Sequence, residues 1–340
     1  MEELAQQANL CYVNDSEPGY HRKRWGRGFT FLDEKDNHIT DEKIRSRLEA
    51  LVIPPAWTDV WICRSPDGHI QATGRDEKGR KQYIYHPDWE EVRNQVKFGR
   101  MRAFGEALPA LRAQVDADMR SHKLSWARVV ALVVSLLDKT LLRVGNAAYT
   151  QANGSFGLTT LHDAHTAVSG SYVTFSFSGK GGKHQEVSLQ DRRLARQVQQ
   201  CQELPGQHLF QYIGEDGERY DLTSTDVNHY LHQHTGQDFS AKDFRTWGAT
   251  ICAAEKLAEL GPAESEAQAE KNLTTAVKYA AEQLGNTYPI CRQYYVHPHV
   301  LEAYQAGQLV DQVQKVQSGQ QKVIDGLSEL ETAVLTILSQ

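Results

Sequence analysis

The spacing of hydrophobic residues changes character near residue 89. Up to that point, short stretches of strand-forming residues alternate with turn residues, as at residues 65–68. Beyond it, hydrophobic residues recur at the spacing of amphipathic helices. The expected strands are residues 25–32, 60–63, 69–73 and 82–85, and the expected helices are residues 89–113, 125–142, 189–201, 225–234, 240–259 and 264–284. The pattern predicts an α+β protein with a small N-terminal β-sheet domain, residues 1–88, and a larger, mostly helical domain, residues 89–340.

The helical domain is also expected to contain one β-hairpin. Residues 171–178 and 183–189 alternate as strands do, and the glycine-rich tip between them holds Lys180. Near the C-terminus, residues 305–323 are rich in glutamine and glycine and predict a loose connection. Residues 324–338 repeat hydrophobic side chains at helical spacing, which predicts an amphipathic helix docked on the body.

Two further features of the sequence make predictions about individual residues. Ser240 and Asp243 have the spacing of a capping box and predict the start of a helix. The tryptophans of the β-domain, Trp25, Trp57 and Trp61, are expected in its core because large aromatic side chains dominate the burial in small domains.

Composition narrows the class of protein. The chain has 340 residues, 40% of them hydrophobic and 24% charged, which is ordinary for a globular protein with a sizeable core. No hydrophobic run is long enough to cross a bilayer, and the N-terminus is acidic where a secretory signal is basic, so we expect a cytoplasmic protein. The five cysteines are odd in number and have no CxxC spacing, which predicts reduced thiols.

The charge pattern leaves two interpretations open. A net charge of −6 argues against a nucleic-acid partner. However, basic residues gather at 22–27 and 75–81, whereas acidic residues are frequent at 254–270 and 326–331. One face could therefore be positive while another is acidic, or the clusters could be ordinary solvated charges.

Four separate segments carry side chains that suit a phosphate. Arg143 follows an apolar helix, Lys180 lies on the hairpin tip, and Lys242 and Arg245 are spaced to share one helix face. The fourth segment, residues 284–298, is polar and aromatic. Each has an ordinary structural interpretation: a helix C-cap, a solvated lysine, cations paired with carboxylates, and aromatic packing. Taken together, the four segments predict one anion-binding site.

The four segments, in this order, resemble the bacterial and poxvirus-type type IB DNA topoisomerases. The matching motifs are Arg143-Val-Gly-Asn, Phe177-Ser-Gly-Lys, Lys242-Asp-Phe-Arg-Thr-Trp-Gly and Tyr295-Val-His-Pro, with further matches at residues 153–161 and 74–86. The resemblance spans nearly the whole chain. It implies relaxation of supercoiled duplex DNA by transient cutting of one strand through a 3′-phosphotyrosyl intermediate, swivelling of the duplex, and resealing without ATP or metal.

The resemblance implies that Tyr295 is the nucleophile, because this tyrosine directly precedes Val-His-Pro. Its neighbour Tyr294 cannot point the same way in a helix or a strand. Lys180 would donate a proton to the leaving 5′ oxygen, a role that suits a lysine whose pKa is lowered by other cations. A tyrosine with a reference pKa near 10 needs the same cationic surroundings to attack.

The remaining catalytic residues implied by the resemblance are ligands of the phosphate. Arg143 and Arg245 would hold its nonbridging oxygens, since bidentate guanidinium groups match the charge that builds there. Asn286 would donate a further hydrogen bond, and Lys242 would assist beside Arg245. The sequence departs from the family at residues 287–289, where proline is expected directly after the threonine, although the spacing from Asn286 to Tyr295 is kept.

The resemblance also implies a DNA-facing surface on the β-domain. Arg80, Gln82, Tyr83 and Tyr85 would face double-stranded DNA as half of a clamp, and the protein would act as a monomer. An equally good interpretation is that the alternating tyrosines pack one face of a sheet.

Three alternatives remain. His162 and His165 are metal-ligand types at close spacing, but no third strong ligand lies nearby in the sequence, so no metal and no other cofactor is expected. A tyrosine recombinase uses a similar Arg, Lys and Tyr set, although the β-domain and Asn286 favour the topoisomerase. The third alternative is a DNA-binding protein that has kept the fold and lost the chemistry.

Overall fold

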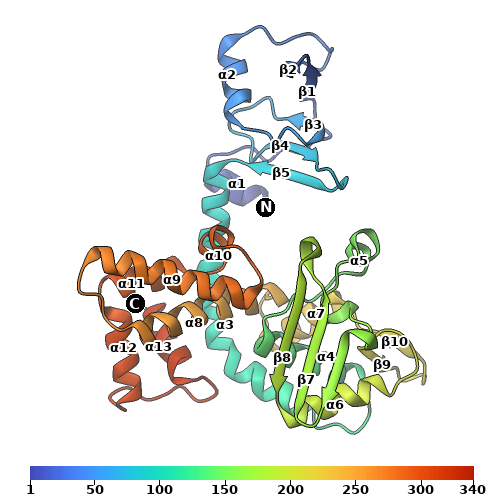
Figure 1. The fold of residues 1–340 in the computed structure, drawn as a ribbon, viewed down its shortest axis with the longest axis vertical. Helices are drawn as coiled ribbons and strands as arrows, with labels where there is room; N and C mark the ends of the chain where they lie inside the picture. The colour runs from blue at the N-terminus through green and yellow to red at the C-terminus, as the bar shows by residue number, and fades with distance from the viewer. The chain divides into compact units, whose positions relative to one another are not determined.

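The computed structural model describes residues 1–340, and their contacts divide the chain into two compact units, Met1–Gly99 and Arg100–Gln340 (Figure 1). The predicted α+β class is confirmed, with a sheet-rich N-terminal unit and a mostly helical C-terminal unit. The sequence-based boundary falls at the start of helix α3 (Pro87–Asp118), whereas the contacts divide the chain within that helix. None of the helices is long and apolar enough to cross a membrane.

The N-terminal unit is built on a five-stranded antiparallel sheet in the order β2-β1-β3-β4-β5. Its elements are α1 (Glu2–Gln7), β1 (Tyr20–Trp25), β2 (Gly28–Leu32), α2 (Glu42–Ala50), β3 (Thr58–Ile62), β4 (Ile70–Arg75) and β5 (Lys81–Tyr85). Leu48 of α2 packs against Phe31, Val60, Ile62 and Ala72 of the sheet. This helix therefore covers one face of the sheet and closes a small core.

Two predictions for this unit need correction. Residues 25–32 are not one strand, because β1 ends at Trp25 and β2 begins at Gly28, with a turn between them. Trp25 is 62% exposed, so it is not a core residue, whereas Trp61 is buried and Trp57 packs against the core as predicted. Trp25 is the last residue of β1, and its indole contacts the ring of His38, with the centroids 5.0 Å apart.

The C-terminal unit contains the predicted helices and several short elements between them. After α3 come α4 (Trp126–Thr140), α5 (Ala147–Asn153), the 3₁₀ turns Leu158–Thr160, Asp163–His165 and Lys180–Gly182, α6 (Arg192–Gln202), β9 (Gln211–Ile213), β10 (Arg219–Asp221), α7 (Ser224–Thr235), α8 (Ala241–Leu260), α9 (Glu266–Leu284), α10 (Tyr288–Tyr294), α11 (Pro298–Gln305), α12 (Gln308–Gln317) and α13 (Glu329–Ile337). The hydrophobic α4 is almost wholly buried.

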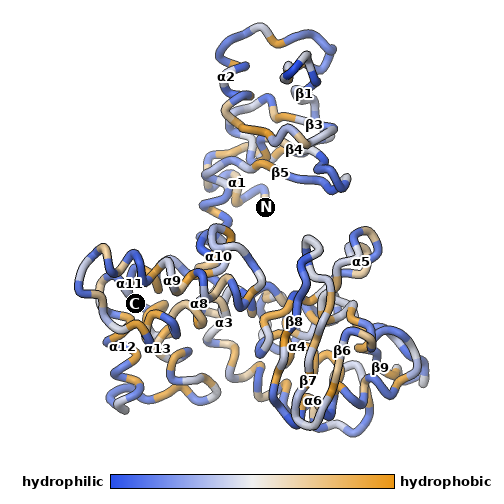
Figure 2. The backbone as a smooth tube through the Cα atoms, in the orientation of Figure 1, coloured by the Kyte–Doolittle hydropathy of each residue, from blue (hydrophilic) through white to orange (hydrophobic).

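The predicted hairpin is present and belongs to a three-stranded sheet in the order β6-β7-β8. Its strands are β6 (Thr166–Ser169), β7 (Tyr172–Ser178) and β8 (His184–Gln190). Val173, Phe175 and Phe177 alternate inward on β7 and are buried, which fixes the register. Figure 2 shows that the β8 side becomes hydrophilic toward the tip, where Lys180 is exposed.

The prediction of a loose connection at residues 305–323 is wrong, because α12 occupies most of it. Leu309, Val310, Val313 and Val316 are buried along one side of this helix together with Gln312, whereas its other glutamines are exposed, as in an amphipathic helix. The predicted C-terminal helix is confirmed as α13, although it begins only at Glu329.

A buried ion network attaches α13 to the rest of the unit. Glu331 accepts hydrogen bonds from Arg112 Nη2 at 2.7 Å and from Trp247 Nε1 at 3.1 Å. Arg112 also donates from Nε to Asp138 at 2.8 Å and from Nη1 to the carbonyl of Gly326 at 3.1 Å. Burial alone would raise the pKa of Glu331, but these donors lower it below its usual value. Glu331 therefore links α13 to α3 and to α8.

We expect Glu331→Gln to lower the free energy of unfolding by roughly 2–3 kcal/mol at pH 7, because Arg112 keeps only Asp138 as a carboxylate partner. Since the folded-state pKa of Glu331 is depressed, its contribution is present above the unfolded-state pKa and disappears as the pH falls through the folded-state value. Urea denaturation at pH 7 and in acid measures both effects. Glu329→Gln, on the exposed side of the same helix, is the control and should change little.

Candidate active site

Residues from four distant segments line one cavity of about 410 Å³ in the C-terminal unit. Arg143 lies in the connection after α4, Lys180 on the hairpin tip, Lys242 and Arg245 in the first turns of α8, and Tyr295 directly after α10. Five of the six catalytic residues expected from the sequence therefore meet here. The sixth, Asn286, is attached to this group through Arg143.

Arg245 is the most buried cation of the cavity, with 5% of its surface exposed. Its Nη1 donates to the carbonyl of Leu141, and its Nη2 donates to the carbonyl of Leu284 at 3.0 Å. These carbonyls lie at the C-terminal ends of α4 and α9, where the helix dipoles favour a positive charge. Two helix ends thus hold the guanidinium in place.

The electrostatic state of Arg245 favours an anion beside it. Burial lowers its pKa to about 10, and the positive charge of Arg143 adds to this effect. The group still carries its charge at neutral pH, but without full solvation. Its Nε is buried and has no hydrogen-bond partner. A phosphate oxygen would supply both the missing acceptor and the missing counter-charge.

The close approach of α8 to the end of α4 explains the local sequence. Leu141 rather than a glycine adopts the left-handed conformation after α4, with φ of 55°. The C-cap therefore lies two residues before Arg143, for which a C-cap was the ordinary structural interpretation. The side chain of Leu141 packs against Gly248 of α8, where any Cβ would collide with it. Glycine at position 248 thereby brings Arg245 within reach of the Leu141 carbonyl.

Arg143 orients the side chain of Asn286. Its Nη2 donates to Asn286 Oδ1 at 2.7 Å, so the amide nitrogen of Asn286 is left as a hydrogen-bond donor. That nitrogen is buried and has no partner. Asn286 follows Gly285, which ends α9 in the left-handed conformation at φ of 62°. The geometry therefore provides one further unsatisfied donor next to the guanidinium groups.

Tyr295 lies at the C-terminal end of α10, and its ring centroid is 5.4 Å from the guanidinium carbon of Arg245. The hydroxyl of Thr250 accepts a hydrogen bond from the amide of His297 at 3.0 Å and lies 3.3 Å from the backbone carbonyl of Tyr295. Sequence reasoning missed Thr250, a fully buried residue of α8 that joins this helix to the tyrosine segment. Pro289 is accommodated in the first turn of α10, where no backbone donor is needed.

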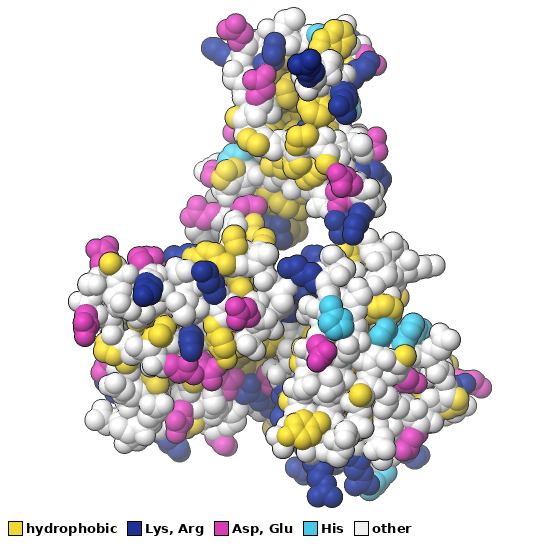
Figure 3. All heavy atoms as spheres, viewed as in Figure 1, with side chains coloured by type: hydrophobic (Ala, Val, Ile, Leu, Met, Phe, Trp, Pro, Cys, Tyr) yellow, Lys and Arg dark blue, Asp and Glu magenta, His cyan; other side chains and the backbone are white.

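Both lysines of the cavity are exposed and form no ion pair. The carboxylate next to Lys242 belongs to Asp243, and the predicted capping box uses it. It accepts a hydrogen bond from the backbone amide of Ser240 at 2.8 Å and forms no ion pair with Lys242. Lys180 lies in a tip where Gly181 and Gly182 have positive φ. Figure 3 shows basic side chains gathered at this end of the hairpin. The site thus combines two hydrogen-bonded arginines with two exposed lysines.

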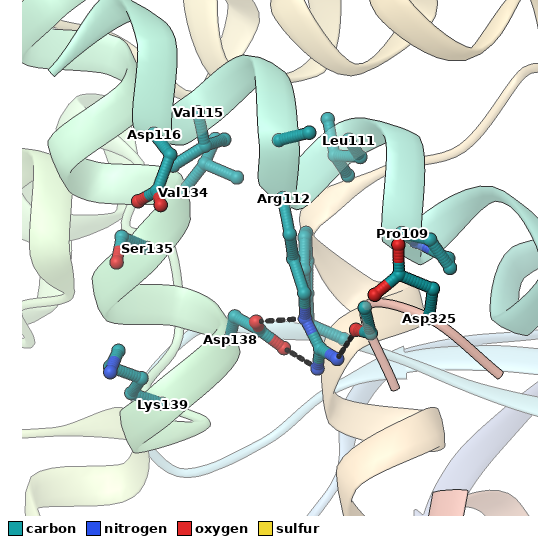
Figure 4. A pocket seen from close by; sticks show the side chains of 13 residues that line it. Pro109, Leu111, Arg112, Val115, Asp116, Val134, Ser135, Asp138, Lys139 and Asp325 are labelled. Carbon is teal, nitrogen blue, oxygen red and sulfur yellow. Dashed lines mark hydrogen bonds and ion pairs between the residues drawn. The ribbon is translucent and has the colours of Figure 1, made fainter. Parts of the chain in front are cut away.

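The other candidate sites do not offer such an arrangement. His162 and His165 stack on each other with ring centroids 5.3 Å apart, and no group of three potential ligands in the chain could hold a metal ion. A larger hollow of about 620 Å³ lies beside α3 and α4, but its arginine, Arg112, is already bound to Asp138 (Figure 4). Asp116 and Lys139 of this hollow are likewise paired, with Arg193 and Asp191.

The DNA-facing residues expected on the N-terminal unit lie on and just before β5. Asp76 accepts hydrogen bonds from Arg80 Nε at 2.8 Å and from Gln82 Nε2 at 2.9 Å. Its pKa is lowered to about 2, first of all by Arg80. Tyr83 and Tyr85 stack with ring centroids 5.7 Å apart, on the side of the strand opposite the core residue Ile84. Tyr83 is 43% exposed.

The chain is similar to known proteins over most of its length. Residues 86–323 match the family described as "Eukaryotic DNA topoisomerase I, catalytic core", and residues 28–76 match "Bacterial DNA topoisomerase IB, N-terminal domain". The chain is 31% identical to the DNA topoisomerase 1B of Acanthamoeba polyphaga mimivirus, over 84% of this chain and 88% of the viral protein. It is 24% identical to the DNA topoisomerase 1B of vaccinia virus, over 71% and 74% of the two chains.

Among solved structures, the chain is similar to the XerH site-specific recombinase bound to its difH substrate. The TM-score is 0.35 at 16% identity, covering 65% of this chain and 55% of the recombinase chain. The family assignment depends instead on the matched catalytic core, which covers most of the chain, and on the mimivirus relative. On these grounds the chain belongs to the type IB DNA topoisomerase family.

Proposed function

We propose that this protein relaxes supercoiled duplex DNA by cutting and resealing one strand through Tyr295. The observation that carries the proposal is the cavity in which one tyrosine lies with four cations that come from three separate segments. A phosphodiester has one negative charge and gains more on its nonbridging oxygens during substitution, so this surrounding stabilises the transition state more than the ground state.

In the cleavage step, the Tyr295 phenolic oxygen attacks the phosphorus, and a phosphotyrosyl bond to the 3′ end forms as the bond to the 5′ oxygen breaks. The phenol loses its proton to solvent, and the 5′ oxygen gains one from Lys180. Resealing reverses both transfers. Because one phosphoester bond replaces another, the protein needs no ATP to restore the strand.

The two arginines have different expected parts in this step. Arg245 is held by two backbone carbonyls, so its guanidinium would meet the phosphate in a fixed orientation. Arg143 is anchored only by Asn286, and the pair would bind a second oxygen through a guanidinium and an amide donor. Lys242 would add charge beside Arg245. This division predicts that Arg245 contributes the most preorganised contact.

The N-terminal unit is proposed to contact the same duplex. Asp76 orients Arg80 and Gln82, and Tyr83, which is exposed and stacks on the half-buried Tyr85, offers aromatic surface beside them. Such side chains suit phosphates and base edges. We propose a monomer that clamps the duplex, acting on DNA in the nucleoid.

The decisive assay is relaxation of a supercoiled plasmid that carries no special site, in EDTA and without ATP. We expect full relaxation by catalytic amounts of protein, read from topoisomer ladders on agarose gels. A site-specific recombinase would leave such a plasmid supercoiled, and a DNA-binding protein without chemistry would do the same. Denaturing electrophoresis with an end-labelled duplex should also detect a 3′-linked adduct. Absence of both products would end the proposal.

A further inference from the structure

Gln185 occupies a position where the strand pattern calls for a hydrophobic residue. On β8, Val187 and Leu189 lie opposite the buried Phe175 and Val173 of β7, and Gln185 lies opposite the buried Phe177 on the same face. Its amide nitrogen donates only to the adjacent carbonyl of His184, at 3.2 Å. This single local hydrogen bond does not explain why a glutamine occupies the inward face of β8. The contacts of the Gln185 side chain with neighbouring residues are the other possible reason.

The side chain of Gln185 fills space left by two glycines. A Cβ at Gly179 would lie 2.7 Å from Gln185 Cγ, and a Cβ at Gly285 would lie 2.7 Å from Gln185 Oε1. Gly285 is already required by the left-handed end of α9. Gly179, with φ of −89° and ψ of −169°, has a backbone conformation open to any residue. The contact with Gln185 is what excludes a side chain there.

These two glycines directly precede two proposed catalytic residues. Gly179 precedes Lys180 and Gly285 precedes Asn286, and Gln185 lines a small hollow together with Lys180, Arg143 and Arg245. The tip has internal hydrogen bonds, from Gly179 to Lys183 and from Gly182 to Gly179, which set its shape but not its position on the body. On the β7 side, the amide of Phe156 holds the carbonyl of Ser178 at 2.8 Å.

We infer that Gln185 is a positioning residue that seats the Lys180 tip against the turn at Gly285. It holds the β8 side of the tip as the Phe156 amide holds the β7 side. The inference rests on the proposed function, because the purpose of this seating is to bring the Lys180 ammonium to the 5′ oxygen as that oxygen leaves. Gln185 itself transfers no proton and touches no reacting atom.

The test compares two duplexes that differ in one atom at the scissile phosphate. One has the natural 5′ oxygen, and the other has sulfur there, whose thiolate leaves without protonation because thiols are far more acidic than alcohols. In single-turnover cleavage, Gln185→Ala should slow the oxygen substrate by roughly 10- to 100-fold. The sulfur substrate should be cleaved close to the wild-type rate. Gln190→Ala, an exposed glutamine on the same strand, is the matched control.

Two further variants separate positioning from other causes. Asn286→Ala should stay slow on both substrates, because it removes a phosphate donor rather than the proton donor. Gly179→Ala should reproduce the Gln185→Ala defect by displacing that side chain, and the double variant should be no slower than either single variant, since the clash is gone.

The inference is overturned if Gln185→Ala slows both substrates equally, cleaves both at the wild-type rate, or adds its defect to that of Gly179→Ala. Failure of the proposed function is a different outcome, because the wild-type protein would then form no adduct with either duplex.

Discussion

Tyr295→Phe is expected to abolish the covalent adduct with DNA and to lower the cleavage rate by roughly 10⁴-fold or more, because it removes the only oxygen that can attack the phosphorus. The ring that lies against Arg245 remains, so the fold and the affinity for duplex DNA should be nearly unchanged. Denaturing electrophoresis with an end-labelled duplex measures the adduct, and gel shift measures binding.

Tyr294→Phe is the matched control, since Tyr294 is adjacent and does not line the cavity. It should retain most of the cleavage rate. The assignment of the nucleophile would be reversed if Tyr294→Phe lost the adduct while Tyr295→Phe kept it. Plasmid relaxation should follow the adduct in both variants, because swivelling requires the broken strand.

The local parts of this site could be predicted from the sequence. The capping box at Ser240 sets the start of α8, and therefore the face that Lys242 and Arg245 share. The alternation on β7 and the glycines of the tip set the exposed location of Lys180. Each pattern spans a few residues and is governed by local backbone preferences. The order of the motifs then indicated which distant segments meet.

The contacts that hold the side chains are non-local and could not be predicted. The carbonyls that bind Arg245 come from positions 141 and 284, and nothing in either segment marks its carbonyl as a ligand. Thr250 gave no signal because a single threonine within a helix is common. Gln185 gave a weak signal, as the one polar residue on the inward face of β8.

The errors in the fold have similar physical causes. Strand β1 was missed because four of its six residues are exposed and its sequence is mostly basic, so its pairing with β2 and β3 decides its structure. Helix α12 was missed because glutamine content was weighed above the spacing of its buried leucine and valines, which does follow a helical period. For α12, glutamine content led to the wrong prediction, whereas the spacing of the hydrophobic residues indicates a helix.

Arg245→Ala should slow cleavage by roughly 10²- to 10⁴-fold, because it removes a preorganised cation from a buried position where solvent cannot replace it. Arg245→Lys should restore little of this rate, since a lysine cannot donate to two carbonyls and to a phosphate oxygen in one plane. Single-turnover cleavage of a short duplex measures both variants, with affinity determined separately by gel shift.

Affinity for duplex DNA should fall by less than roughly tenfold in Arg245→Ala, since one phosphate contact is a small part of an extended electrostatic interface. Arg292→Ala removes the same charge from an exposed position on α10 and should leave the cleavage rate near that of the wild type. Equal losses of rate and affinity in Arg245→Ala would mean that this arginine binds the ground state and the transition state alike. The held geometry at the ends of α4 and α9 would then serve DNA binding rather than catalysis.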